Sequence, residues 1–382
     1  MATKVIPGLE GVAAAETRLS YVDGLAGELF IGGHPLMELA PHATFEEAAF
    51  LLWHDRLPNE DELSALKSRF RGGQELPRTT KHVLEAAAAR KAPVIDALRM
   101  ACATLSLGDP NPDDITPEGQ LRRAERICAA FPVIVASYVR IREGKDVVPP
   151  RDDYSHAANY MYMLSGEEPH ADFVRAMDTY LVTAMDHGMN ASTFTGRVIV
   201  STESDLYSAI TGAIGALKGP AHGGAPGPAL DMVFEIGTAD RADANIRERL
   251  ERGERLMGFG HRVYKVRDPR ADVLSQASER LYEQAGDRTL YDLARSVEET
   301  ALRLLEEYKP GRNLQTNLEY YTALVLHGVG LSSELFTPTF AVGRVGGWSA
   351  HCLEQLSHNR LIRPSSVYTG PKDRRWVPLE QR

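Results

Sequence analysis

Apolar side chains recur at helical spacing through most of this chain, and the pattern limits the folds open to it. Over residues 171–185 they return every three or four positions, as on the buried side of a helix, and residues 289–308 repeat the pattern. Only residues 17–33 have the character of strands, because Asp23-Gly24 is a common hairpin turn between two short apolar runs. The sequence therefore predicts an all-α fold with a small N-terminal β-hairpin. It disfavours Rossmann and barrel folds, which alternate strands with helices.

Signals at helix termini place several of these helices. Thr44 and Asn59 each stand three residues before a glutamate, which is the spacing of a capping box. Thr116-Pro117 puts proline where it suits a first helical turn. The helix that follows, 120–142, is expected to be interrupted or kinked near Pro132. The other predicted helices span residues 190–200, 205–217, 228–237, 241–257, 270–285, 318–329 and 337–358.

The chain has 382 residues and a formal net charge of −9. This length exceeds one typical core, so two domains are expected. Clustered lysines and arginines are missing, which argues against a nucleic-acid partner. No apolar run approaches the roughly 20 residues of a membrane span, and the N-terminus lacks the apolar core of a secretory signal. The three cysteines lie far apart, which argues against a disulfide framework and fits a reducing compartment. These features predict a cytoplasmic protein with neither a nucleic-acid nor a membrane partner.

Two histidines lie at glycine-rich breaks between helices. His222 belongs to a break in which residues 219–228 include four glycines and three prolines, and His261 follows Gly258-Phe259-Gly260. Glycine allows a ligand or another backbone segment to approach closely. Both could be ordinary loop histidines, but their shared setting makes them candidates for a functional site.

Other titratable residues also stand at breaks. His187 ends a helical stripe, and Glu319 begins a helix behind the expected cap residue Asn317. A helix N-terminus stabilises a carboxylate, so Glu319 could equally serve only to complement the helix dipole.

Arginines lie close to several of these candidates. Arg270 follows His261 within a run that holds three arginines, and that run could simply be solvated surface. Arg344 interrupts an apolar, small-residue helix and needs an anionic partner there, either a structural carboxylate or a ligand. Arg363 precedes a proline near the C-terminus.

A metal site is not expected. None of the candidate histidines and carboxylates has the i, i+4 spacing of zinc-binding helices. His351 and His358 stand seven residues apart, which suggests an exposed or interface stripe. The chain also lacks a phosphate-binding loop, a strand-led dinucleotide motif and the G-x-S-x-G elbow of hydrolases.

Long motifs of this chain resemble those of the citrate synthases. They are LKGPAHGGAPGPALDM, RLMGFGHRVYKVRDPRADVL, DHGMNASTFTGRV and TNLEYYTALVLHGVGLSSELFTPTFAVGRVGGW, and the similarity covers nearly the whole chain. The resemblance, which is to the compact dimeric branch of the family, implies an almost wholly helical homodimer. It also implies a large domain of residues 1–222 and 328–382 and a small domain of residues 223–327 that moves on closure.

The resemblance implies a role for each candidate. His222 would hold the acetyl thioester carbonyl, His261 would polarise the oxaloacetate carbonyl, and Glu319 would be the catalytic base. The residues that would bind the oxaloacetate carboxylates are His187, Arg270, Arg344 and Arg363, the last reaching the neighbouring subunit's site. Those that would meet CoA are Met257, Gly258, Phe259, Gly260 and Lys265. Acetyl-CoA would be a co-substrate, and no tightly bound cofactor is implied.

Glu319 departs from the family pattern, which has Asn-Val-Asp where this chain has Asn-Leu-Glu. The extra methylene moves the carboxylate by about 1.5 Å, one C–C bond, and a misplacement of about 1 Å can cost on the order of a hundredfold in rate. Two alternatives to citrate synthase therefore stay open. One is a 2-methylcitrate synthase that uses propionyl-CoA, and the other is a catalytically weak homologue that binds CoA or a dicarboxylate.

Overall fold

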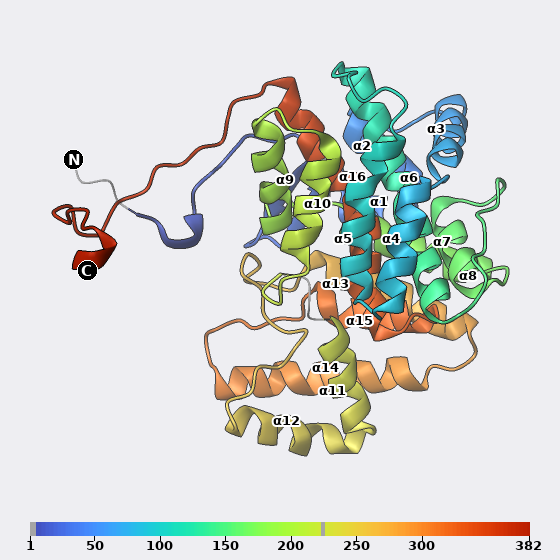
Figure 1. The fold of residues 1–382 in the computed structure, drawn as a ribbon. Coiled ribbons are helices and arrows are strands. Elements are labelled where there is room, and N and C mark those ends of the chain that lie inside the picture. The colour runs from blue at the N-terminus through green and yellow to red at the C-terminus, as the bar shows by residue number, and fades with distance from the viewer. Residues whose placement is uncertain (1–4, 223–225) are drawn as a thin grey trace.

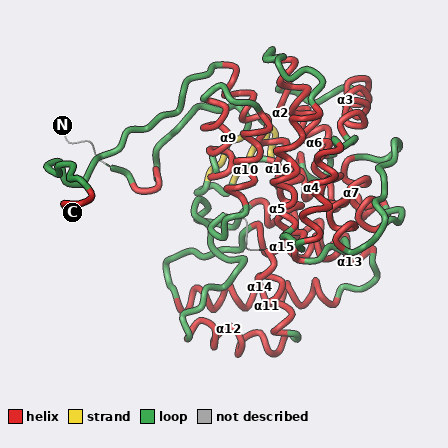
Figure 2. Tube along the Cα trace, viewed as in Figure 1, coloured by secondary structure: helices red, strands yellow, loops and turns green. Residues whose placement is uncertain are grey.

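Helices form nearly all the regular structure, which confirms the predicted all-α class (Figures 1 and 2). The structure is a computed structural model and describes residues 5–222 and 226–382. Its α-helices are α1 (Leu36–Leu39), α2 (Phe45–His54), α3 (Glu60–Gly73), α4 (Arg78–Ala89), α5 (Val94–Thr104), α6 (Pro117–Arg142), α7 (His156–Ser165), α8 (Ala171–Met185), α9 (Ala191–Ser201), α10 (Leu206–Leu217), α11 (Pro226–Ile236), α12 (Ala242–Glu251), α13 (Pro269–Gln284), α14 (Thr289–Tyr308), α15 (Leu318–Gly328) and α16 (Phe336–Ser357).

The predicted hairpin is present and gains a third strand. β1 (Ser20–Asp23) pairs antiparallel with β2 (Glu28–Ile31), which pairs in turn with the short β3 (His34–Pro35). The Asp23 carboxylate accepts hydrogen bonds from the backbone amides of Leu25 and Ala26, both at 2.8 Å. This side chain therefore closes the turn that the sequence places at Asp23-Gly24.

Both predicted capping boxes are formed, at the starts of α2 and α3. Pro117 occupies the first turn of α6, as expected. α6 continues through Pro132, so the helix is not interrupted there, and a kink at this proline stays a prediction. The extent predicted for the helix over 241–257 is wrong: it ends at Glu251 as α12, because Gly253 adopts a φ of 74°, which an α-helix cannot accommodate.

α16 lies at the centre of the upper body, where it packs against α6, α8 and α9 (Figure 1). The approach to α8 is close because α16 carries glycines on that side. A Cβ on Gly347 would lie 2.1 Å from the carbonyl oxygen of Met185, and one on Gly343 would lie 2.9 Å from that of Leu181. These glycines bring the C-terminal end of α8 against the middle of α16, beside Arg344.

α11, α12 and α14 lie together at the bottom of the view in Figure 1, below the upper helices. α12 packs against α14, and α11 packs against α15. α13 contacts both α15 and α8, so it joins this lower layer to the upper body. This arrangement fits the predicted small domain of residues 223–327, and the division into two domains stays a prediction.

The segments at both ends of the described chain extend away from the body on the same side (Figure 1). They carry exposed apolar side chains, among them Ile6, Leu9, Tyr368 and Trp376. Within the described residues, no helix combines the length and apolar character that crossing a bilayer requires.

The close approach at Gly347 generates a stability prediction. We expect Gly347→Ala to lower the free energy of unfolding by about 1–3 kcal/mol, the usual cost of overpacking, because the new methyl group would overlap the Met185 carbonyl. Urea unfolding followed by circular dichroism measures this change. Gly72→Ala is the matched control: it also lies in a helix but has open space around it, so it should be neutral or stabilising. Equal effects of the two substitutions would contradict the prediction.

Candidate active site

Six of the predicted site residues line one cavity of about 170 Å³. They are His187, His222, His261, Arg270, Glu319 and Arg344. They come from the end of α8, the loop after α10, the loop before α13 and the helices α13, α15 and α16. Segments that are distant in the sequence therefore converge on one small, partly enclosed space.

His222 is fixed by the start of α9. The backbone amide of Ser192 donates to its Nε2 at 3.3 Å, and the Ser192 hydroxyl lies 2.8 Å from the same nitrogen. The indole of Trp348 donates to that hydroxyl at 3.0 Å. Because a backbone amide can only donate, Nε2 accepts and the ring proton lies on Nδ1. Burial, helped by the charge of Arg344, lowers the pKa of His222 to about 4, so the ring is neutral at pH 7.

His261 has the opposite tautomer. Its Nδ1 accepts from the backbone amides of Val263 and Tyr264, both at 3.1 Å, which leaves the proton on Nε2. The Arg270 guanidinium lies 3.3 Å from Nε2, so both groups can donate to one acceptor placed between them. Burial and the charge of Arg270 lower the pKa of His261 to about 4. The ring is therefore a neutral hydrogen-bond donor.

The loop of His261 is held by the strand-like segment before α15. Gly260 donates to the carbonyl of Gln315 at 2.7 Å, and Asn317 donates to the carbonyl of Gly258 at 2.9 Å. Both glycines have positive φ, 87° for Gly258 and 83° for Gly260. A Cβ on Gly258 would also lie 2.8 Å from the Tyr320 ring, so this turn depends on glycine.

The two arginines are buried but held differently. Arg270 forms a two-point ion pair with Asp268, from Nε to Oδ1 at 3.0 Å and from the terminal nitrogen to Oδ2 at 2.8 Å. Arg344 is 2% exposed, donates from Nε to the carbonyl of Ala184 and stacks on Phe340. Among the described residues, no carboxylate lies within 4.0 Å of its guanidinium nitrogens. Burial lowers the pKa of Arg344 to about 10, so it is a charged group available to an anion.

Glu319 lies in the first turn of α15, where its amide donates to Asn317 Oδ1 at 3.0 Å. The sequence suggests that the helix N-terminus favours the ionised form. In the structure burial dominates and raises the pKa of Glu319 to about 6, against the opposing charges of Arg270 and Arg255. At pH 7 about ten carboxylates remain ionised for each protonated one. This pKa lies close to the working range expected for a general base.

His187 completes the polar lining of the cavity. Its Nε2 lies 3.1 Å from the Tyr264 hydroxyl, and its ring meets that of His261 edge-on, with the centroids 5.6 Å apart. Burial and the charges of Arg270 and Arg344 hold the pKa of His187 well below its usual value. The site thus contains three neutral imidazoles, two positive charges and one carboxylate.

The remaining predicted residues lie outside this cavity. Met257, Gly258, Phe259 and Gly260 form the turn before His261, and Lys265 is exposed beyond it. The Lys265 amide donates to the carbonyl of Gly24 at 2.8 Å, which ties this loop to the hairpin. Arg363 lies in the exposed C-terminal segment and does not reach the cavity of its own subunit.

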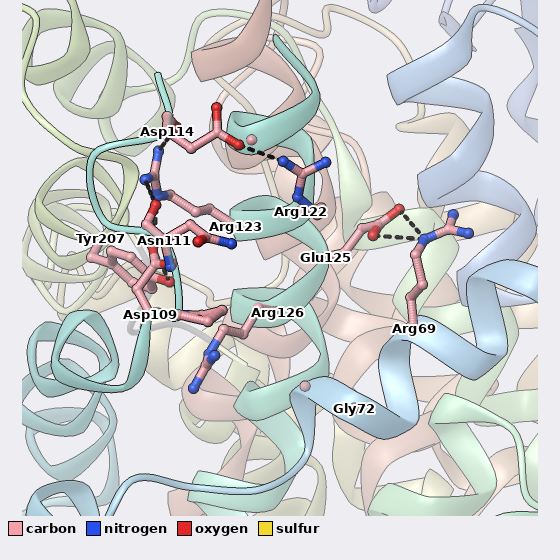
Figure 3. Close-up of a pocket in the computed structure, with 13 residues that line it drawn as sticks. Arg69, Gly72, Asp109, Asn111, Asp114, Arg122, Arg123, Glu125, Arg126 and Tyr207 are labelled. Atoms are coloured by element: carbon pink, nitrogen blue, oxygen red, sulfur yellow. Dashed lines mark hydrogen bonds and ion pairs between the residues drawn. The ribbon is translucent and has the colours of Figure 1, made fainter. Parts of the chain in front are cut away.

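A second cavity, of about 230 Å³, lies between α3, α6 and α10 (Figure 3). Its acids are paired with its arginines: Arg69 with Glu125 at 2.8 Å, and Arg123 with Asp109 at 2.7 Å. It contains no histidine. The described residues also contain no cluster of histidine, cysteine, aspartate and glutamate fit to hold a metal ion. The histidine cavity is therefore the candidate active site.

Comparison with known proteins identifies the family. A model described as "Citrate synthase, C-terminal domain" matches residues 8–365. The chain belongs to the citrate synthase family. It is therefore an enzyme of the acyltransferase type, and its fold and motifs agree with the resemblance read from the sequence.

Relatives within the citrate synthase family match along nearly their whole length. Citrate synthase 2 of Bacillus subtilis is 43% identical over 98% of each chain. A 2-methylcitrate synthase of Shewanella oneidensis is 38% identical over 98% of this chain and 97% of its own.

Solved citrate synthases share the fold. The enzyme of Pyrobaculum aerophilum superposes with a TM-score of 0.92 at 38% identity and covers 99% of this chain and 95% of its own. The citrate synthase of Thermoplasma acidophilum, solved in a ternary complex with carboxymethyl coenzyme A and oxaloacetate, has a TM-score of 0.90 at 30% identity, and the match covers 99% of this chain and 100% of that one.

Sequence reasoning missed several residues of this citrate synthase site. Asn190 and Phe340 line the cavity, and Asp268 and Ser192 orient its side chains. Asp268 could have been found, since an aspartate before Pro269 is a helix cap signal directly beside Arg270. Phe340 stands one helical turn before Arg344, a spacing that places the two on one face.

Proposed function

We propose that this chain condenses acetyl-CoA with oxaloacetate and water to give citrate and CoA, as a citrate synthase. The observation that carries the proposal is the convergence, in one cavity, of two neutral histidines with opposite tautomers, a carboxylate and two arginines. Such a set can remove a weakly acidic proton and stabilise the oxyanions that form on both substrates.

Oxaloacetate would lie among the cations. Its two carboxylates match the positive charges of Arg270 and Arg344. The pair with Asp268 engages Nε and one terminal nitrogen of Arg270, so its other terminal nitrogen would meet one carboxylate, and the guanidinium of Arg344 would bind the other. The Nε2–H of His261 would donate to the ketone oxygen and draw electron density from the carbon that is attacked. His187 would contribute a further polar contact.

The acetyl group would lie between Glu319 and His222. A thioester methyl group is a very weak acid, so a carboxylate can remove its proton only if the enol oxygen is stabilised at once. Glu319 would take the proton, while the Nδ1–H of His222 donates to the thioester oxygen. The enol carbon would then attack the polarised ketone, whose oxygen would take the proton of His261 and become the hydroxyl of the product. Water would hydrolyse the citryl thioester and release CoA.

CoA would reach this cavity along the turn of residues 257–260, with Lys265 close to its phosphates. We propose that residues 223–327 form a small domain that closes over the bound substrates and excludes water until the carbon–carbon bond exists. The boundary with the large domain falls at residues 223–225, which lie outside the described residues. The ternary complex of the Thermoplasma acidophilum enzyme with carboxymethyl coenzyme A and oxaloacetate supports a site that holds a CoA compound and oxaloacetate together.

A second candidate is 2-methylcitrate synthesis from propionyl-CoA, which the Shewanella oneidensis relative favours. One methylene of acyl specificity is worth only about 1–3 kcal/mol and depends on the shape of the pocket. A catalytically weak homologue is the third possibility left by the sequence, and the complete set of polar groups in the cavity argues against it. A cytoplasmic location stays a prediction of the sequence.

The first prediction tests the reaction and both histidines. We expect the chain to release CoA thiol only when oxaloacetate and acetyl-CoA are both present, with a higher kcat/KM for acetyl-CoA than for propionyl-CoA.

His222→Ala and His261→Ala should each lower kcat by at least about a hundredfold, the usual scale for such groups. Thermal unfolding of both variants should resemble that of the parent. No thiol release by the parent would refute the function, and normal turnover by either variant would refute that histidine's role.

The second prediction concerns Glu319 as the base. Only the ionised form accepts a proton, and burial places its pKa at about 6. We expect the rate of the proton-transfer step to be constant above about pH 7 and to fall about tenfold per pH unit below pH 6. Exchange of the acetyl-CoA methyl protons into deuterated water, with a non-condensing oxaloacetate analogue bound, measures this step. Glu319→Gln should nearly abolish the exchange while oxaloacetate binding stays close to that of the parent. Exchange at the parental rate in Glu319→Gln would show that another group is the base.

The third prediction concerns assembly. We propose a homodimer in which Arg363 enters the partner's site, because the exposed apolar segment that carries it extends away from its own body. Light scattering should give twice the 42.0 kDa mass of the chain. His222→Ala and Arg363→Ala should each be deficient alone, whereas their hybrid should recover activity, because one of its two sites is intact. If equal amounts of the two variants assort at random, about half of the dimers are hybrids, and each hybrid has one intact site of two. The mixture should therefore show about a quarter of the parental activity. A hybrid no more active than either variant would place Arg363 outside the partner's site.

A further inference from the structure

A buried chain of charged and polar side chains leads from the cavity into the interior. Asp186, directly before His187, is 0% exposed, and so is His351 on α16. His351 Nε2 lies 3.1 Å and 3.2 Å from the two carboxylate oxygens of Asp186. The expectation that His351 forms an exposed or interface stripe with His358 is therefore wrong for His351. Complete burial of an ionised aspartate costs folding free energy unless a partner compensates its charge, so this pair needs a structural or functional reason.

The hydrogen-bond roles of the two His351 ring nitrogens are set from its other side. Arg197 on α9 approaches Nδ1 at 3.1 Å and pairs with Glu354 at 2.6 Å. Because a guanidinium can only donate, Nδ1 must accept, and the ring proton lies on Nε2. His351 therefore donates one hydrogen bond that is shared by both oxygens of Asp186.

Asp186 contacts His351 and lies within the influence of the charge of Arg344, which lines the cavity. A Cβ on Gly347 would lie 3.1 Å from its Oδ1, so glycine is needed for the carboxylate to lie against α16. Burial alone would raise the pKa of Asp186, but His351, with Ser20 and Arg344, lowers it below its ordinary value. Asp186 is thus an anion that stabilises the charge of Arg344. It nevertheless forms no ion pair with Arg344 within 4.0 Å.

We propose that His351 is a positioning residue for the dicarboxylate substrate: by engaging both oxygens of Asp186, it keeps this carboxylate from pairing with Arg344. The inference rests on the proposed role of Arg344 in binding oxaloacetate. An aspartate freed from His351 would have one strong buried partner nearby, the guanidinium, and a carboxylate–guanidinium pair would occupy the nitrogens that the substrate needs. The arrangement keeps Arg344 charged and without a carboxylate partner, while its Nε still donates to the carbonyl of Ala184.

Two isosteric substitutions separate this role from a merely structural one. The terminal amide of His351→Gln reaches the position of Nε2 and can still donate to Asp186. The shorter amide of His351→Asn reaches only the position of Nδ1, where it faces Arg197. We expect His351→Asn to weaken oxaloacetate binding by about tenfold or more, the scale of one charge-assisted hydrogen bond. His351→Gln should stay within about threefold of the parent.

A double variant gives the sharper test. If the freed carboxylate competes for Arg344, removing its charge relieves the competition. His351→Asn with Asp186→Asn should therefore bind oxaloacetate at least about threefold more tightly than His351→Asn alone. If His351 only supports the fold, the second substitution in the buried core should weaken binding further or leave it unchanged. Cys352→Ala, buried on the same helix and outside this network, is the control for core damage and should bind as the parent does.

Calorimetry on the full chain measures the dissociation constant of oxaloacetate directly, without turnover. Parental affinity in His351→Asn, or a double variant no tighter than the single one, would overturn the inference. His351→Asn that does not fold, combined with weak binding by His351→Gln, would overturn it as well. Failure of the proposed reaction is seen separately, as absence of thiol release by the parent protein.

Discussion

Positive charge buried in a helical interior organises this active site. Arg270 and Arg344 are both almost inaccessible to solvent, and burial, reinforced by their positive charge, lowers the pKa of the neighbouring imidazoles and keeps them neutral. A neutral ring has one donor and one acceptor, so its hydrogen bonds decide which atom faces the substrate. The backbone amides that fix His222 and His261 thus determine the chemistry as much as the histidines do. The same burial raises the pKa of Glu319 and makes it a better base.

The buried position of Arg344 depends on how closely α8 packs against α16. The glycines of α16 allow the backbones to approach so closely that Arg344 donates to the last turn of α8, and Asp186 lies beside Gly347. Larger side chains at these glycines would push the helices apart and separate the arginine from both groups. The apolar, small-residue character of this helix is therefore a requirement of the site rather than of the core alone.

The sequence predicts the helices and the residues of the site better than it predicts the contacts that hold those residues in place. Capping boxes and apolar spacing depend on neighbours within one or two turns, and they located α2, α3 and α14 correctly. Gly253 ended α12 earlier than apolar spacing suggested, because positive φ overrides periodicity. The pair of Asp186 and His351 spans 165 positions and joins two helices. No local pattern indicates a contact over that separation, and the sequence alone therefore places His351 in an exposed or interface stripe.

Contacts between distant segments also affect the position of Glu319, the proposed base. Glutamate in place of aspartate extends the carboxylate by about 1.5 Å, which by itself would displace the base. The segment before α15, however, is tied to the glycine turn at two points, through the carbonyl oxygens of Gln315 and Gly258. These hydrogen bonds set the position of the Glu319 backbone relative to the His261 loop, whatever the length of the side chain. A longer side chain on a fixed backbone changes only where the carboxylate lies within the cavity. Its raised pKa is then a property of burial and would be expected of either acid at this place.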